Sequence, residues 1–169
     1  MRLIETLESR CLMHAGFSAA VNFQPLGAPA AAGMMRDYGS VFGERRDGHQ
    51  YGWNADQSAG VVDRNLVKSQ KNDTFIVIPA GAKWEIALPE AGEYDVYVVA
   101  GDPGQVNERM AIMVEGQVAI SGITRRTKPW LEAAVTVKVT DGRLTVEGAS
   151  WVDSNKLSYI SVSYTHLTL

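Results

Sequence analysis

Cysteine, clustered histidine and long apolar runs are scarce in this sequence, and each scarcity excludes a class of protein. Cys11 is the only cysteine, so no disulfide can form within the chain. His14, His49 and His166 lie far apart, and no Cys or His spacing matches a zinc site. No apolar run approaches the roughly 20 residues that a membrane-spanning helix needs, so we expect no membrane anchor in this chain.

Charge of one sign is also lacking. The chain carries 16 Lys and Arg against 19 Asp and Glu, a formal net charge of −3, and the two signs are interspersed. Without a basic stripe to approach phosphate backbones, nucleic acid is not an expected partner. Catalytic signatures are missing as well: there is no Gly-x-Ser-x-Gly elbow, phosphate loop or His-based metal motif. We therefore predict that the protein is not an enzyme; a glycoside hydrolase would require two carboxylates facing each other across a cleft.

The sequence does contain strong β patterning. Its hydrophobic content of 46% fits one globular domain. Apolar and polar residues alternate with period two through residues 83–88, 93–100, 134–140 and 143–147, and turn residues separate these runs. We find no helix of three turns. The pattern predicts an all-β protein, an antiparallel β-sandwich or jelly roll, with tight hairpins at residues 115–116 and 141–142.

The two ends differ from this central region. Residues 1–18 predict an irregular or short-helical N-terminal arm, and residues 7–13 resemble the LExRxLM segment of large secreted proteins of environmental bacteria, with Cys11 where a second Arg is usual. The domain is expected at residues 19–161. Residues 162–169, when back-translated, match a transposase-type sequencing adapter. We interpret them as a non-native tail at the end of a metagenomic fragment, the alternative being a genuine β-strand.

Residues 24–71 contain many glycines and prolines and little clean alternation. A stretch this long without regular structure is unusual in a compact domain, and long loops often carry function. We therefore expect the binding surface here first.

A series of motifs along the chain resembles one family, the malectin-like, galactose-binding-like jelly-roll modules of secreted bacterial proteins. The matching motifs are residues 21–25, 38–43, 51–54, 63–65, 73–74, 84–89, 92–94 and 98–103. The resemblance implies an antiparallel jelly roll whose loops at one end can hold a sugar. It predicts a non-catalytic carbohydrate-binding module of a larger extracellular protein, with a polysaccharide or oligosaccharide and neighbouring domains as partners. The alternative is a structural or adhesive spacer that binds no small ligand.

A sugar site needs an aromatic platform for the C–H faces of the ring and nearby polar groups for its hydroxyls. The predicted stacking residues are Tyr38, Tyr51 and Trp53. The predicted hydrogen-bonding residues are Asn54, Arg64 and Asp102.

Five of these six residues also have a structural interpretation. Trp53 and Tyr51 could pack in the sandwich, and Tyr38 could anchor a buried loop. Arg64 could form an ion pair with Asp63 that fixes the loop, and Asp102 could cap its own turn.

The sequence also gives expectations for two other tryptophans and for cofactors. Trp84 alternates with Ile86 and Leu88 and is expected in the core, whereas Trp151 is either a sugar platform or a loop plug. No cofactor is expected. A structural calcium ion is compatible with such a sandwich, but no segment has the spacing of a recognised calcium loop, so no ligands are assigned.

Overall fold

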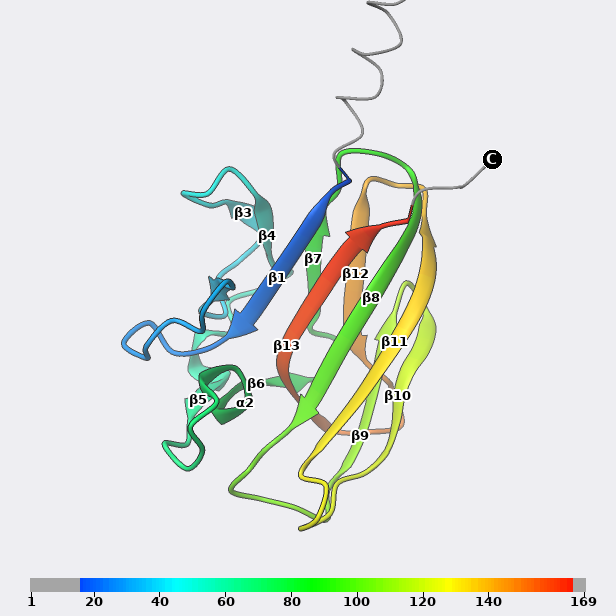
Figure 1. Ribbon diagram of the computed structural model, residues 1–169. Helices are drawn as coiled ribbons and strands as arrows, with labels where there is room; N and C mark the ends of the chain where they lie inside the picture. Colours follow the sequence, from blue (N-terminus) through cyan, green and yellow to red (C-terminus); the bar gives the residue numbers. More distant parts are fainter. Residues whose placement is uncertain (1–15, 166–169) are drawn as a thin grey trace, which may run out of the picture.

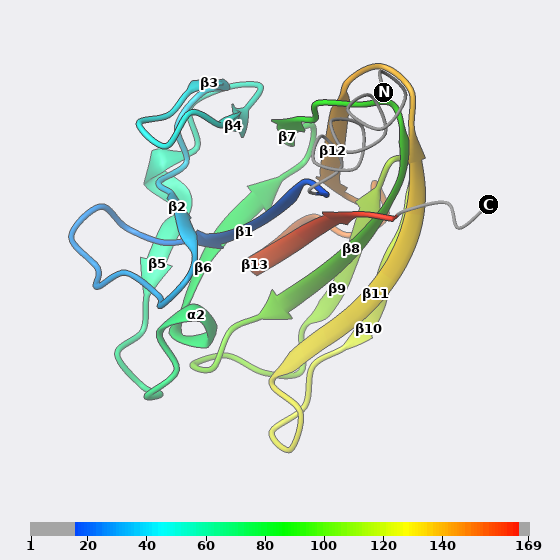
Figure 2. The same cartoon turned by 45° about the horizontal axis from the view of Figure 1, so that its top comes forward.

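The computed structural model describes residues 16–165, which form two β-sheets packed face to face (Figure 1, Figure 2). The first sheet has seven strands: β1 (Ser18–Phe23), β2 (Met35–Asp37), β5 (Val61–Asp63), β6 (Thr74–Pro79), β8 (Gly92–Gly101), β11 (Trp130–Val139) and β13 (Ser154–Tyr164). The second sheet has six: β3 (Gly43–Glu44), β4 (Gln50–Trp53), β7 (Lys83–Ala87), β9 (Arg109–Val114), β10 (Gln117–Ile123) and β12 (Arg143–Gly148).

The strand order confirms the predicted antiparallel sandwich. In the first sheet the order is β11-β8-β13-β1-β2, with β6 also pairing with β13, and β5 pairing with β6. In the second sheet it is β10-β9-β12-β7-β4-β3. The pairing of β1 with β2 is parallel, which the sequence did not indicate. The short strands β2, β3 and β4 come from the irregular segment and lie along one side of the sandwich (Figure 2).

The core lies between the inner faces of the two sheets. On β8 the predicted alternation holds, because Tyr94, Val96 and Val98 are buried and belong to the core cluster. From the second sheet, Trp84 and Ile86 on β7 belong to the same cluster, and neither is exposed. The prediction that Trp84 is a core residue is confirmed.

One of the two predicted hairpins is confirmed and the other is wrong. Glu115 and Gly116 have φ angles of 50° and 74° and join β9 to β10, as a tight primed turn requires. Asp141 and Gly142 instead join β11 to β12, which lie in different sheets. β11 pairs with β8, and β12 pairs with β7 and β9, so this turn is a corner between sheets.

The outermost strands of the described region extend past the predicted domain limits at both ends. β1 begins at Ser18, and β13 runs through the predicted boundary at Ser161 to Tyr164. Val162 is buried, and the Tyr164 ring packs edge-on against Tyr94 at 5.2 Å between centroids. Residues 1–15 of the predicted N-terminal arm and residues 166–169 of the suspected non-native tail lie outside the described residues.

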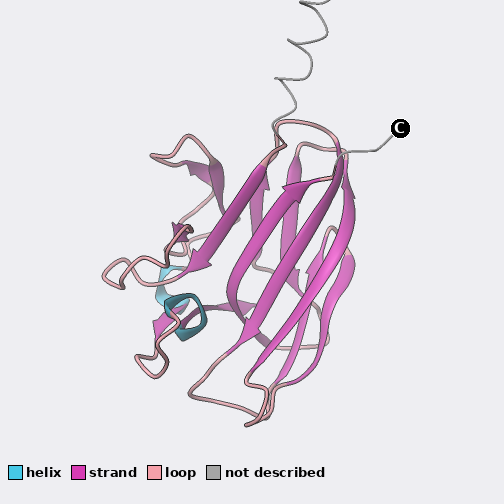
Figure 3. Cartoon of the chain, viewed as in Figure 1, coloured by secondary structure: helices cyan, strands magenta, loops and turns pink. Residues whose placement is uncertain are grey.

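Helical structure is minor within residues 16–165. It consists of the 3₁₀ turn η1 (Ser58–Gly60) and the single-turn helix α2 (Gln70–Asp73), both on the side of the irregular segment (Figure 3). Neither has the length or the apolar character to cross a membrane.

Candidate functional site

A buried carboxylate, Asp37, organises the centre of the irregular segment. Its Oδ1 accepts hydrogen bonds from the Trp53 indole at 3.1 Å and the Gly39 amide at 2.7 Å. Its Oδ2 accepts from the Trp84 indole at 2.9 Å. Burial raises the pKa of Asp37 from its ordinary value, and these three donors, with the charge of Arg45, act against that rise. Sequence reasoning missed Asp37, whose signal was its place directly before the Tyr38-Gly39 turn.

The predicted stacking residues Trp53 and Tyr51 lie in the core. Trp53 is 0% exposed and packs edge-on against Phe23, with 5.9 Å between ring centroids. Tyr51 is 2% exposed and donates its phenol proton to the Arg36 carbonyl at 2.9 Å. A sugar needs an exposed ring face, and Trp53 offers none in this structure. Tyr51 reaches the surface only at the edge of a hollow described below.

Asn54 holds a turn between strands. Its Nδ2 donates to the Gly81 carbonyl at 3.0 Å, and its Oδ1 accepts from the Lys83 amide at 3.0 Å. The side chain therefore bonds to backbone groups of the connection between β6 and β7 and of the first residue of β7. Its amide acts as donor and as acceptor in these two bonds.

Arg64 and Asp102 come together, as part of a charged network at the ends of β5 and β8. Arg64 donates to the two Asp102 oxygens at 2.8 and 2.6 Å. Lys156 donates to Asp102 at 3.0 Å and to Glu108 at 2.6 Å, and the Gly104 amide donates to Asp102 at 2.8 Å. Asp102 is wholly buried. Burial acts to raise the pKa of Asp102, but the hydrogen bonds from Arg64 and Lys156 outweigh it and hold that pKa below its ordinary value.

The expected ion pair between Arg64 and Asp63 is therefore wrong. Asp63 accepts from the Asn65 amide at 3.2 Å, whereas the guanidinium of Arg64 points to Asp102. Neighbouring side chains in extended backbone point to opposite sides, which separates Asp63 from Arg64.

Of the three predicted stacking residues, Tyr38 is the one that lies at an open surface. It is half-buried and lines a hollow of about 340 Å³, which we call the Tyr38 hollow. The complete lining is Met34, Met35, Arg36, Tyr38, Ser40, Arg45, Arg46, Asp47 and Tyr51. Its volume lies at the lower end of the roughly 300–1,000 Å³ that is usual for small-ligand sites. The Tyr38 hollow falls inside residues 24–71, the segment expected to bind.

Two of the arginines in the lining lie over aromatic rings. The Arg36 guanidinium lies 5.6 Å from the centre of the Tyr38 ring, so a ligand that reaches Tyr38 also meets a cation. The Arg45 guanidinium lies 5.0 Å from the centre of the Tyr51 ring. Burial, and then the charges of Asp47 and Asp37, raise the pKa of Tyr51, so its phenol stays protonated. The signal for these cations was the Arg45-Arg46 pair, close in sequence to Tyr51.

Gly52 gives Arg45 its position. Arg45 Nη2 donates to the carbonyls of Val41 at 2.9 Å and Tyr51 at 2.6 Å, which fixes the guanidinium at the hollow. A Cβ on Gly52 would lie 2.6 Å from that same Nη2 atom and 2.6 Å from the Ser40 carbonyl oxygen. Gly52 also has a φ of 142°, a backbone conformation that L side chains rarely adopt.

We expect Gly52→Ala to displace Arg45 and to lower the free energy of unfolding by about 2–6 kcal/mol, since strain and steric overlap each cost about 1–3 kcal/mol. Gly48 provides the control, because its φ is 85° and a Cβ added there would meet no atom within 4 Å. Gly48→Ala should cost only the backbone strain. Urea denaturation of both variants measures the difference, and equal losses would contradict a steric role for Gly52.

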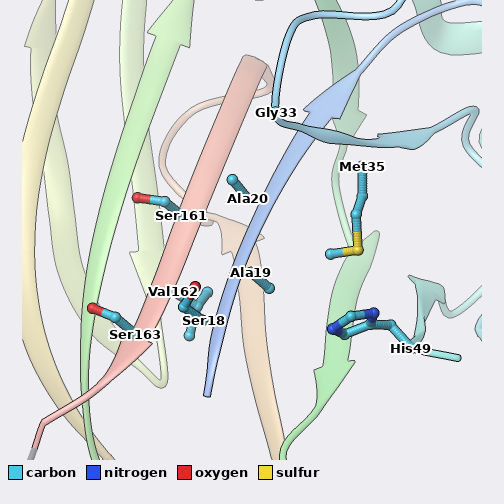
Figure 4. A pocket seen from close by; sticks show the side chains of 9 residues that line it. All are labelled: Ser18, Ala19, Ala20, Gly33, Met35, His49, Ser161, Val162 and Ser163. Carbon is cyan, nitrogen blue, oxygen red and sulfur yellow. The ribbon is translucent and has the colours of Figure 1, made fainter. Parts of the chain in front are cut away.

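A second hollow of about 340 Å³ adjoins the first along β2, since Met35 lines both. Figure 4 shows Met35 and His49 across from β1, with Ala19 on the side of that strand that faces them. The other lining residues are Ser18, Ala20, Gly33, Ser161, Val162 and Ser163. These are mostly small side chains without a formal charge, so this hollow offers shape and few directed contacts.

Two further features bear on the alternatives. Within residues 16–165, no three His, Cys, Asp or Glu side chains gather as a metal site would need. Trp151 is 55% exposed, in the connection between β12 and β13, and so is not a buried plug.

Comparison with known proteins finds similar folds among solved structures. No protein-family model and no curated protein matches this chain. Among solved structures, the Bacillus subtilis protein YxiM is similar with a TM-score of 0.62, at 18% identity over 88% of this chain and 40% of its own. A Bacteroides uniformis β-glucuronidase is similar with a TM-score of 0.55, at 12% identity over 89% of this chain and 18% of its own. A plant complex of the peptide RALF23 with FER and LLG2 contains a chain similar at a TM-score of 0.57, with 13% identity over 90% of this chain and 41% of that one.

At these identities the similarity extends to the fold, which is an all-β sandwich. The chain spans less than half the length of each of these three proteins.

Proposed function

We propose that this chain is a non-catalytic carbohydrate-binding domain of a larger extracellular protein, and that its ligand occupies the Tyr38 hollow. One observation carries the proposal: a half-buried aromatic ring lines an open hollow together with several hydrogen-bond donors. A sugar needs this combination, because its C–H faces pack on aromatic rings while its hydroxyls require polar partners.

The polar groups of the hollow fit hydroxyl recognition. Ser40 supplies a hydroxyl, Arg45 and Arg46 supply guanidinium donors, and Asp47 supplies an acceptor. Among the described residues that line the hollow, Asp47 is the only acidic one. A hydrolytic mechanism with two carboxylates would need a second one, which supports a binding role over a catalytic one.

The sequence and the comparisons support the rest of the proposal. The resemblance of residues 21–103 to malectin-like modules favours carbohydrate, and that of residues 7–13 favours secretion. The short coverage of similar proteins fits one domain of a longer chain.

The alternative function is a structural or adhesive spacer that binds no small ligand. Its support is specific: Trp53, Asn54, Arg64 and Asp102 all have hydrogen-bond partners within the fold. Under this alternative the Tyr38 hollow would be a surface irregularity between short strands.

Calorimetric titration with a panel of soluble glycans separates the two functions. We expect Tyr38→Ala to weaken binding about tenfold, the equivalent of about 1.4 kcal/mol, because it removes the ring. Tyr38→Phe keeps the ring and should bind almost as well. Trp151→Ala is the matched control, since Trp151 is exposed in a different connection. A larger loss in Trp151→Ala than in Tyr38→Ala would move the site to that loop, and a folded protein that binds no glycan would favour the spacer.

A further inference from the structure

The Tyr38 hollow has an excess of positive charge. Three arginines, Arg36, Arg45 and Arg46, line it with a single carboxylate, Asp47. Asp47 is already engaged with His49: its Oδ1 accepts from the His49 amide at 2.9 Å and lies 3.3 Å from the ring Nδ1. The chain as a whole has a formal net charge of −3, so this local concentration of cations runs against the overall balance.

None of the three arginines forms an ion pair with any residue in the range 16–165. Other cations of the fold do have carboxylate partners: Arg64 lies 2.6 Å from Asp102, and Arg143 lies 2.8 Å from Glu85. Three arginines that share one carboxylate in the lining repel one another, and the repulsion is stronger where the surface is hollowed and partly shielded from water. An anionic group in the hollow would remove that cost.

The three arginines differ in how firmly they are held. Arg45 is fixed by hydrogen bonds to two carbonyls, at 2.9 and 2.6 Å, and Arg36 lies over the Tyr38 ring. Arg46 is exposed in the turn between β3 and β4, and its side chain makes no hydrogen bond within the described region. The hollow therefore combines two positioned guanidinium groups with one that can adjust to a ligand.

We propose that the Tyr38 hollow selects acidic saccharides, with a carboxylate or sulfate group held by Arg36 and Arg46 beside the Tyr38 ring. This inference rests on the proposed carbohydrate binding and names its ligand class. Guanidinium groups match such oxyanions because their planar N–H donors can bond two oxygens at once. The aromatic ring distinguishes an acidic sugar from a free anion, since it also packs against the C–H face of the ring.

Matched polymers test the selectivity. Polygalacturonate and its fully methyl-esterified form share one sugar and differ in charge, and dextran sulfate and dextran provide the same comparison for sulfate. We expect at least about tenfold tighter binding of the acidic member of at least one pair. The pair that shows the difference identifies carboxylate or sulfate as the recognised group. Binding should weaken between about 0.1 and 1 M salt, as the Debye length falls from roughly 10 to 3 Å.

Single substitutions locate the effect. Arg46→Ala and Arg36→Ala should each weaken binding of the acidic polymer about tenfold and weaken binding of the neutral polymer clearly less, so that the preference for the acidic form falls. Arg126→Ala is the matched control. It removes the same charge from an exposed site in the connection between β10 and β11, at the bottom of Figure 1, whereas β3 lies at the upper left.

The outcomes separate this inference from the proposed function. Equal binding of each acidic polymer and its neutral form would overturn the acidic selectivity and leave saccharide binding in place. An equal loss in Arg126→Ala and Arg46→Ala would also overturn it, because it would show general charge attraction. Failure of the folded protein to bind any saccharide, acidic or neutral, would overturn both.

Discussion

Replacing Asp37 with alanine should lower the free energy of unfolding by at least about 3 kcal/mol. Three buried N–H donors lose their acceptor together: the indoles of Trp53 and Trp84 and the amide of Gly39. Each unsatisfied buried donor costs about 1–3 kcal/mol, so the sum is a large fraction of the 5–15 kcal/mol that stabilises a typical domain. Urea denaturation measures the loss, and near-UV circular dichroism follows the two tryptophans.

Asp37→Asn should be less damaging than Asp37→Ala. The amide keeps one oxygen acceptor and fills the same space, but its NH₂ group faces a donor that the carboxylate had satisfied. Asp153→Ala is the control, because Asp153 is exposed and makes no hydrogen bond or ion pair among residues 16–165. If Asp37→Ala and Asp153→Ala had the same stability, the role assigned to Asp37 would be refuted.

Replacing Asp102 with alanine should lower the free energy of unfolding by about 3 kcal/mol, the lower end of what it costs to break a buried ion pair. Arg64 and Lys156 lose the carboxylate that they share, and the Lys156 side chain is only 9% exposed. Lys156 keeps its contact with Glu108 at 2.6 Å, which limits the loss.

Two comparisons make this prediction specific to the buried network. Arg64→Ala should cost less than Asp102→Ala, because the Arg64 side chain is 35% exposed and water can replace part of its contacts. Glu147→Ala, which removes a surface pair with Lys83 at 3.5 Å, should cost about 0–1 kcal/mol. Losses of equal size at Asp102 and Glu147, compared by urea denaturation, would contradict the predicted importance of burial.

The same network predicts an acid-dependent loss of stability. The pKa of Asp102 is lower in the folded protein than its ordinary value of about 3.9, which we take for the unfolded chain. Its contribution is therefore fully present above that value and is lost as the pH falls through it toward the folded pKa. Stability measured from pH 6 downward to about pH 2 should fall less steeply in Asp102→Asn than in the native sequence. Parallel curves for the two proteins would contradict this linkage.

The alternation of residue types determined most of the secondary structure. Residues 93–100 became the central part of β8, and Glu115 with Gly116 formed the predicted hairpin, because both signals act over neighbouring residues. The turn at Asp141 and Gly142 could not be interpreted in the same way. An Asp-Gly turn fits a hairpin or a corner, and the choice depends on β11 pairing with β8, far away in the sequence.

The sequence predicted the segment that contains the candidate site, but it predicted few of the residues that line it. The glycine-rich segment 24–71 does contain the Tyr38 hollow, and Tyr38 itself lines it. Arg36, Arg45 and Arg46 were not among the predicted residues, because nothing in their local sequence shows that they lack carboxylate partners. That property depends on which acidic side chains the fold brings near them.

By itself, the sequence determined that this protein is an all-β sandwich, because period-two alternation places one face of each strand inside. Only the tertiary structure decided which aromatic residues remain accessible. Trp53 and Tyr38 lie in the same segment, but the Trp53 indole meets a carboxylate 16 residues away that also binds Trp84, and this pairing allows its burial. Tyr38 lies beside Arg36 at an open edge. Burial of a polar aromatic side chain requires a partner for its N–H or O–H group, and only the folded chain supplies one.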